Sequence, residues 1–285
     1  MRGDSKESCT NCGSAVIRRY CADCGQAVPR ATDYSLRAFA ADSIDQIASV
    51  DGRAVRTVKT LLARPGLLTA DHMRGRRARY LRPLQLFLLV NVLLFVVAPK
   101  VPMFTYSLDR YLANSPPSPS LVAALVQRAT TMGTVDRAAY TTAFDGRVES
   151  QRKTLILIFV PAIALVLRVL FAWRRTRDGV PHRYGEHLVF ALHLLSLIWL
   201  VLTVWGGIAT LAAGTTLGPL AGIGALAIII GMLLAGFVYL MRSVRLVYEL
   251  SDLQSVAVSA ALAVAFAGLL LAYRGLLFFT TYYTL

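Results

Sequence analysis

Charged residues are scarce in this chain of 285 residues, and acidic residues are the scarcest. Asp, Glu, Lys and Arg together make up 16% of the sequence, where about a quarter is usual in soluble proteins. Apolar residues make up 56%, and the mean hydropathy is +0.56. This composition excludes an ordinary water-soluble globular protein and indicates a membrane protein.

Recognisable catalytic patterns are also missing. The sequence has no Gly-rich phosphate loop, no H-E-x-x-H motif and no convincing pair of nucleophile and base. The first seven residues, MRGDSKE, lack the apolar core of a secretory signal. We therefore expect the N-terminal segment to lie in the cytosol and favour a non-enzymatic protein.

The remaining charge is strongly positive, with 30 Lys and Arg against 16 Asp and Glu and a net charge of +14. Most basic residues crowd the ends of apolar runs, where they act as topology signals. This placement favours the lipid bilayer, rather than nucleic acid, as the partner of the basic residues.

Five apolar runs approach the roughly 20 residues that a helix needs to cross a bilayer. They span residues 83–98, 154–173, 188–212, 217–241 and 256–280. The sequence therefore predicts an all-α integral membrane protein with about five transmembrane helices. We divide it into a zinc ribbon (1–30), a cytosolic amphipathic helical linker (31–82) and a membrane domain (83–285).

Arginine-rich connections set the orientation of these spans. The cluster before the first span consists of Arg74, Arg76, Arg77, Arg79 and Arg82. With the Arg-rich connections inside, the N-terminus is cytoplasmic and the C-terminus is periplasmic. The same arginines are candidates for binding anionic lipid headgroups, each worth roughly 1 kcal/mol.

The strongest motif is the repeated C-x-x-C-G of Cys9, Cys12 and Gly13 and of Cys21, Cys24 and Gly25. Two thiolates in each repeat can reach one metal across a tight turn, and the glycine allows the turn to close. Four thiolates form a closed structural shell, typical of Zn²⁺. We expect a hairpin between the repeats, through residues 15–17 and 18–20.

Other uses of these cysteines remain open. A rubredoxin-like iron site has the same ligands. A disulfide pair is disfavoured in the cytosol, and a redox-active C-x-x-C usually belongs to a thioredoxin-like fold. Structural Zn²⁺ is the favoured interpretation.

Four polar residues near or within the spans are candidate functional groups: Asn91, Glu186, His187 and His193. Ionisable groups in a membrane are costly and often functional. Glu186 and His193 are seven residues apart, so they share a helix face. For His193 the favoured interpretation is a structural one, a neutral ring bonded to a backbone carbonyl or to a hydroxyl of a neighbouring helix.

Two further regions have helical patterns. In the linker, apolar residues recur at 36–47 and at Val55, Val58 and Leu62; Arg64-Pro65-Gly66 ends the second helix, and a short segment follows at 67–73. The loop 99–153 is expected to be extracytoplasmic, with short helices at 121–127 and 138–144.

Several segments together resemble a family of uncharacterised bacterial multi-pass membrane proteins, a domain-of-unknown-function family that begins with a zinc ribbon. The matching segments are the cysteine repeats through Gln26, residues 56–66, residues 75–84 and residues 184–193. The resemblance implies a location in the inner membrane of Gram-negative bacteria and no assigned activity.

Three functions are compatible with these features. The first is a membrane-anchored interaction or scaffold protein that binds an unknown cytosolic protein through its zinc ribbon. The second is a small transporter or channel that uses His193, Asn91 and Glu186. The third is a membrane enzyme acting on lipid or envelope precursors through Glu186, His187 and His193. The first is favoured because it uses the strongest motif.

Overall fold

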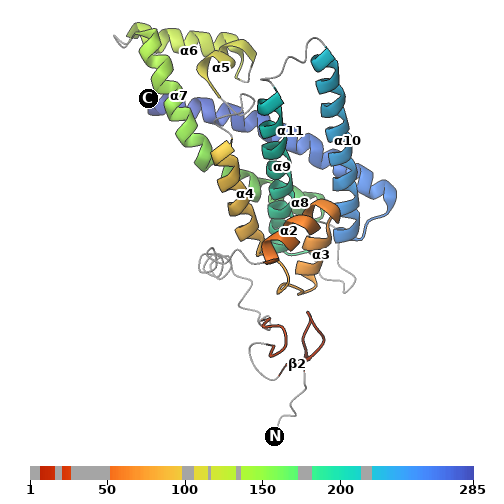
Figure 1. The fold of residues 1–285 in the computed structure, drawn as a ribbon. Coiled ribbons are helices and arrows are strands. Elements are labelled where there is room, and N and C mark those ends of the chain that lie inside the picture. Colours follow the sequence, from red (N-terminus) through yellow and green to blue (C-terminus); the bar gives the residue numbers. More distant parts are fainter. Residues whose placement is uncertain are drawn as a thin grey trace.

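The computed structural model describes residues 7–16, 21–26, 52–97, 106–114, 117–132, 136–172, 182–212 and 220–285. Apart from a short two-stranded hairpin near the N-terminus, the regular elements in these ranges are helices (Figure 1). Four helical stretches are long and apolar enough to cross a membrane: Arg137–Leu170, Tyr184–Ile208, Ala227–Tyr248 and Asp252–Thr284. The chain is therefore a helical, multi-pass membrane protein, as predicted.

The first predicted span is the short helix α4 (Pro83–Val97), which has 15 residues. This is less than the roughly 20 residues of a typical crossing. The helix α4 packs against α9 (Tyr184–Ala212) and buries Phe87 and Val90. Its other face remains exposed, with Val96 at 63%.

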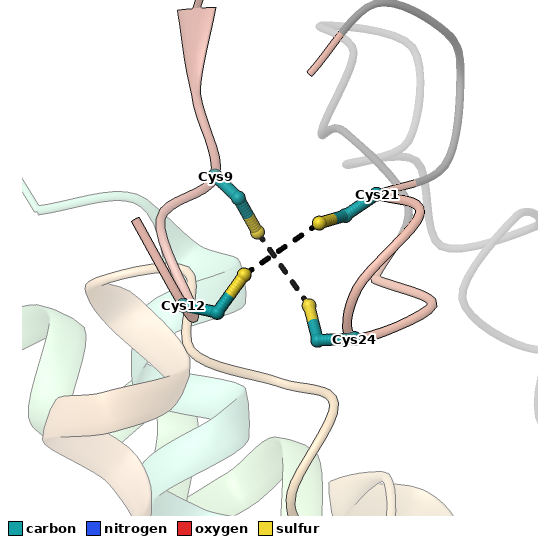
Figure 2. A group of neighbouring side chains, drawn as sticks. All are labelled: Cys9, Cys12, Cys21 and Cys24. Carbon is teal, nitrogen blue, oxygen red and sulfur yellow. Dashed lines mark hydrogen bonds between the residues drawn. The ribbon is translucent and has the colours of Figure 1, made fainter. Parts of the chain in front are cut away.

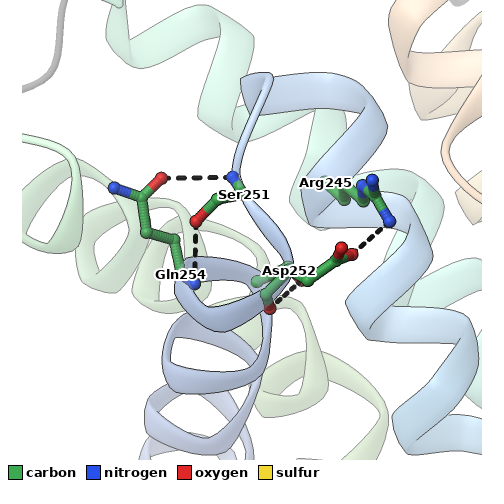
Figure 3. Close-up of polar contacts among 5 residues, drawn as sticks. Arg245, Ser251, Asp252 and Gln254 are labelled. Carbon is green, nitrogen blue, oxygen red and sulfur yellow. Dashed lines mark hydrogen bonds and ion pairs between the residues drawn. The ribbon is translucent and has the colours of Figure 1, made fainter.

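The last two helices, α10 (Leu220–Tyr248) and α11 (Asp252–Thr284), contact each other, and α11 crosses the bundle at a steep angle to α10 in Figure 1. Figure 3 shows the turn that joins them. Ser251 caps α11 by accepting a hydrogen bond from the Gln254 backbone N–H, and the Gln254 side chain accepts one from the Ser251 N–H. An ion pair between Arg245 and Asp252 joins the two helix ends. Such a capping box stabilises a helix start by satisfying its free N–H groups.

The predicted loop 99–153 contains more helix than expected. The helices α5 (Leu108–Asn114), α6 (Pro119–Met132) and α7 (Arg137–Leu155) lie at the end of the bundle opposite the N-terminus (Figure 1). The short helices expected at 121–127 and 138–144 are parts of α6 and α7. A 3₁₀ turn, Ile156–Ile158, continues α7 into α8 (Phe159–Leu170).

Polar contacts hold α7 against the C-terminal part of α11, which explains this extra helix. Gln151 on α7 accepts hydrogen bonds from the hydroxyls of Thr280 and Thr281 and donates one to Thr284. The Tyr273 hydroxyl donates to the carbonyl of Arg152. Tertiary partners thus stabilise a polar helix whose own sequence shows little apolar periodicity.

The predicted linker helices are α2 (Gly52–Ala63) and α3 (Leu67–Met73), and Arg64-Pro65-Gly66 separates them as expected. The helix α3 also contacts both α9 and α10. The predicted apolar stripe on α2 is partly wrong. Val55 and Leu62 are exposed, and the buried face contains Leu61 and Thr57, because the adjoining segment packs on that side. The helix expected at 36–47 lies outside the described residues.

Large apolar side chains cover the outside of the long helices. Leu165 and Val169 on α8, Leu233 on α10 and Val264 on α11 are 58%, 63%, 69% and 73% exposed. Apolar surface on this scale is unfavourable in water. It is what the hydrocarbon core of a bilayer requires.

Candidate metal centre and its surroundings

The four cysteines are held by two copies of the same backbone turn. In the first copy, the Cys9 N–H donates to the Ser14 carbonyl and the Gly13 N–H donates to the Cys9 carbonyl, both at 2.8 Å. In the second, Cys21 and Gly25 make the same pair of bonds at 2.9 Å, with Gln26 in the place of Ser14. The repeated C-x-x-C-G therefore forms two equivalent knuckles.

Both knuckles need their glycine. Gly13 and Gly25 have φ angles of +83° and +69°, which lie in the left-handed region that other residues enter at a cost of about 1–2 kcal/mol. The strands β1 (Glu7–Ser8) and β2 (Ala15–Val16) pair antiparallel across the first knuckle. The sequence predicted a hairpin in which residues 15–17 pair with residues 18–20. In the structure residues 15–16 pair with residues 7–8 instead, and residues 17–20 lie outside the described residues.

The four thiols converge on one point (Figure 2). All four sulfur atoms lie within 4.8 Å of one another, and the pairs Cys9–Cys24 and Cys12–Cys21 are 3.6 Å apart. A disulfide would hold two sulfurs at about 2.05 Å, so these cysteines are free. A tetrahedral site with metal–sulfur bonds of about 2.3 Å has sulfur–sulfur edges of about 3.8 Å. The cluster fits a metal ion.

The surroundings of Cys12 favour the ionised thiolate that a metal needs. Hydrogen bonds from the Ser14 hydroxyl and backbone N–H lower the pKa of Cys12 to about 6. For Cys21, hydrogen bonds from the backbone of Cys24 and Asp23 are outweighed by desolvation and by the Cys12 and Cys24 thiols, and the pKa rises to about 11.

We call residues 7–16 and 21–26 the ribbon, and residues 74–78, which connect α3 to the segment before α4, the docking loop. Gln26 is 7% exposed, and it joins the two. Its side-chain N–H₂ donates to the Gly75 carbonyl and, at 3.0 Å, to the Thr10 hydroxyl. Its side-chain oxygen accepts from the backbone N–H groups of Arg77 and Ala78 at 3.0 and 3.2 Å.

Thr10 completes the contact from the other knuckle. Its hydroxyl donates to the Gly75 carbonyl at 3.2 Å. Gly75 is buried, has a φ of +81°, and a Cβ at this position would lie 3.0 Å from the Thr10 Oγ1. The docking loop therefore needs glycine for its backbone conformation, and a Cβ there would require a small shift of the Thr10 side chain.

The predicted arginine cluster surrounds the docking loop. Arg74, Arg76 and Arg79 are exposed, whereas Arg77 and Arg82 are half-buried. Arg76 lies 3.8 Å from the carboxylate of Asp71, and the Arg77 Nε–H donates to the carbonyl of His72. Three of the five arginines are thus exposed, and one of these, Arg76, lies near a carboxylate.

His193 lies in contact with α3. Its Nδ1 is 2.9 Å from the Thr69 hydroxyl, and both residues are buried. A cavity of about 20 Å³ beside this pair is also lined by Gly66 and Ser243, and it has room for about one water molecule. The Tyr239 hydroxyl on α10 donates to the carbonyl of Leu61 at the end of α2.

The other polar candidates have different partners. Glu186 lies 2.7 Å from the Nδ1 of His182. His187, which is fully buried and stacks on Phe171, has its Nδ1 2.9 Å from the Tyr248 hydroxyl. The structure therefore brings neither Glu186 nor His187 into contact with the Thr69–His193 pair.

Asn91 is 2% exposed in α4. Its side-chain N–H₂ donates to the carbonyl of Phe87, one turn earlier in the same helix, at 2.8 Å. Asn91 therefore lies apart from the hydrogen bonds that Glu186 and His193 make.

Sequence reasoning missed Gln26, Thr10, Gly75 and Thr69 as site residues. For Gln26 the only local signal was its place directly after the second C-x-x-C-G. Thr69 has no such signal, because its partner His193 is 124 residues away.

The comparisons with known proteins add one match. Residues 51–95 match a family described as "Protein of unknown function (DUF3667)". The matched segment covers α2, α3, the docking loop and most of α4. No curated protein and no solved structure matches the chain. The match thus coincides with the segment that connects the ribbon to the membrane helices, and it assigns no activity.

Proposed function

We propose that this chain is a membrane-anchored interaction or scaffold protein whose ribbon holds a structural Zn²⁺ ion and binds a cytosolic protein. The observation that carries the proposal is the closed group of four free thiols in two equivalent knuckles. A shell of four protein ligands leaves no position for substrate, which suits a structural site. The ribbon is too small to fold on its own apolar core, so the metal would supply its stability.

The proposed topology places the ribbon in the cytoplasm and the C-terminus in the periplasm, in a bacterial inner membrane. The exposed arginines of the docking loop support this orientation, since basic residues accumulate on the cytoplasmic side. In this topology α4 is a fifth, short crossing, which local thinning of the bilayer would accommodate. The same arginines would bind anionic headgroups.

The size of the cavity beside His193 favours the scaffold over the transporter. A space of about 20 Å³ holds one water molecule. His193 also has the Thr69 hydroxyl as a partner, which is the arrangement expected of a structural histidine. The enzyme hypothesis needs Glu186, His187 and His193 to act together. Glu186 contacts His182 and His187 contacts Tyr248 instead, which weakens this hypothesis.

Two measurements on the purified and the cellular protein test the proposal. Metal analysis of the full chain should find one Zn²⁺ per chain, and a Cys21→Ser, Cys24→Ser variant should contain none. In-cell cross-linking with mass spectrometry should then capture specific cytosolic proteins with the native chain and not with this variant. An exposed Ser8→Ala substitution in β1 is the matched control and should change neither result.

The outcomes separate the parts of the proposal. Iron in place of zinc would overturn the metal assignment. Identical cross-linking profiles for the native chain and the cysteine variant, at equal membrane levels, would overturn the docking function and leave the ribbon as a folding element.

A further inference from the structure

The contact between the ribbon and the docking loop draws on both knuckles at once. Thr10 lies between the two cysteines of the first knuckle, and Gln26 follows the second. Both donate to one carbonyl, that of Gly75, and they also bond to each other. The docking surface therefore exists only while the two knuckles are held side by side.

Among the described residues, the convergence of the four thiols and the single bond between Gln26 and Thr10 hold the knuckles together. One neutral hydrogen bond contributes little net stability, because it replaces hydrogen bonds with water. Metal ligation of four thiolates in a small zinc domain contributes roughly ten times as much. Without the metal, no interaction of similar strength among the described residues would hold Thr10 and Gln26 side by side.

The docking loop is in turn connected to the membrane helices. The Arg76 N–H donates to the Asp71 carbonyl at the end of α3, and the Arg77 side chain donates to the His72 carbonyl. The helix α3 contacts α9 through Thr69 and His193. The path from the cysteines to the membrane domain is thus a continuous series of hydrogen bonds.

We propose that residues 75–78 are the docking site of the metal-loaded ribbon and that loss of the metal releases the ribbon from the membrane domain. We call the hydrogen bonds of the Gln26 side chain with Gly75, Arg77 and Ala78 the latch. The proposal rests on the proposed metal site. It adds one consequence: binding or loss of the metal determines whether the ribbon is docked at the cytoplasmic end of the helix bundle. Because the coupling is thermodynamically reciprocal, docking also strengthens metal binding.

Amide hydrogen exchange of the full chain in lipid nanodiscs tests the latch directly, with fragmentation that resolves single residues. The N–H groups of Arg77 and Ala78 donate to Gln26, so they exchange slowly while the ribbon is docked. On removal of Zn²⁺ by a chelator we expect their exchange to accelerate about tenfold or more, because the Gln26 oxygen that accepts both hydrogen bonds leaves. Added Zn²⁺ should restore the slow rate.

Neighbouring amides act as internal controls. The N–H groups of Gly75 and Arg76 donate to His72 and Asp71 within the α3 end, and that of Leu81 donates to the Thr57 hydroxyl. These three amides should keep their protection when the ribbon leaves. Acceleration confined to Arg77 and Ala78 distinguishes release of the latch from unfolding of the whole segment.

Substitutions separate the latch from the metal. Gln26→Ala, studied at saturating Zn²⁺, should retain one metal ion per chain and still show fast exchange at Arg77 and Ala78. Gln26→Glu keeps an acceptor oxygen and loses the donor to Gly75, so its exchange should be intermediate. Ser8→Ala should behave as the native chain.

Each outcome decides the question. Exchange at Arg77 and Ala78 that stays slow after measured loss of the metal would overturn the latch while leaving the metal site intact. A native chain that binds no stoichiometric metal would overturn both the metal site and the latch. Fast exchange in metal-loaded Gln26→Ala together with metal-dependent exchange in the native chain would support the latch.

Discussion

Among the described glycines, Gly66 leaves the least room for a side chain. It joins α2 to α3 with a φ of +75°, and a Cβ there would lie 2.9 Å from both the Cα and the carbonyl oxygen of Ser243 on α10. Both neighbours are backbone atoms, so no rotamer change can make room. Gly66→Ala must therefore move α3 away from α10 or distort the turn.

The expected cost follows from two separate effects. A left-handed φ costs a non-glycine residue about 1–2 kcal/mol. Nonbonded atoms prefer about 3.5–4.0 Å, so the helices must separate by roughly 0.5–1 Å, and overpacking of this kind costs about 1–3 kcal/mol. We expect Gly66→Ala to lower the free energy of unfolding by roughly 2–5 kcal/mol.

Two other glycines provide matched controls. Gly236 lies within α10 with no atom near its virtual Cβ, so Gly236→Ala should be neutral or stabilising by up to about 1 kcal/mol. Gly75 has a φ of +81°, but its neighbour is the Thr10 side chain, which can move. Gly75→Ala should therefore show mainly the backbone cost, and its difference from Gly66→Ala isolates the clash with α10.

Unfolding by sodium dodecyl sulfate from mixed micelles, followed by far-ultraviolet circular dichroism, measures these differences. A Gly66→Ala variant as stable as Gly236→Ala would refute the close packing of α3 against α10. Equal losses for Gly66→Ala and Gly75→Ala would show that only the backbone conformation matters.

Three further predictions use the same assay. Thr69→Val should cost about 1–3 kcal/mol because it leaves a buried nitrogen of His193 without its partner; Thr69→Ser should restore most of the loss, and an unchanged stability would contradict the contact. Tyr248→Phe should cost a similar amount through His187, and its effect should add to that of Thr69→Val because the two pairs are separate. Burial, with the nearby Arg77 charge, lowers the pKa of His72 well below 6.5. The unfolded state therefore binds a proton that the folded state does not, and the free energy of unfolding falls as the pH drops below about 6.5. His72→Gln should reduce this pH dependence, and an unchanged slope between pH 7 and 5 would contradict a neutral His72 in the folded protein.

The sequence predicted the features that depend on local pattern. Apolar runs of membrane-spanning length predicted the four long helices, and the break at Pro65 separated α2 from α3 as expected. The spacing of the cysteine repeats predicted four convergent thiols, because a C-x-x-C-G turn places its two sulfurs within a few ångströms of each other.

The features that sequence reasoning missed depend on contacts between distant residues. The helix α7 is polar, and only its residues 138–144 were predicted to be helical, since its stability comes from Gln151 and its threonine partners on α11. The docking of Gln26 joins residues about 50 positions apart, and that distance carries no local periodicity. The contacts of α3 with α9 and α10 are likewise long-range, so the helical pattern of the predicted linker did not indicate them.

The long-range contacts of the docking loop and of α3 all involve residues of the matched segment 51–95. It contains Gly75, which receives the ribbon, Gly66, which allows the approach to α10, and Thr69, which bonds to His193 on α9. A short segment that contacts a four-cysteine module on one side and two long apolar helices on the other cannot vary freely in backbone conformation. Two of its described residues, Gly66 and Gly75, have positive φ angles. A Cβ at either position would lie 3.0 Å or less from an atom of a neighbouring residue. If this segment is the junction between the ribbon and the helix bundle, substitutions in it should disturb both the ribbon and the membrane domain, whereas substitutions in α5 and α6 should leave the ribbon's metal unaffected.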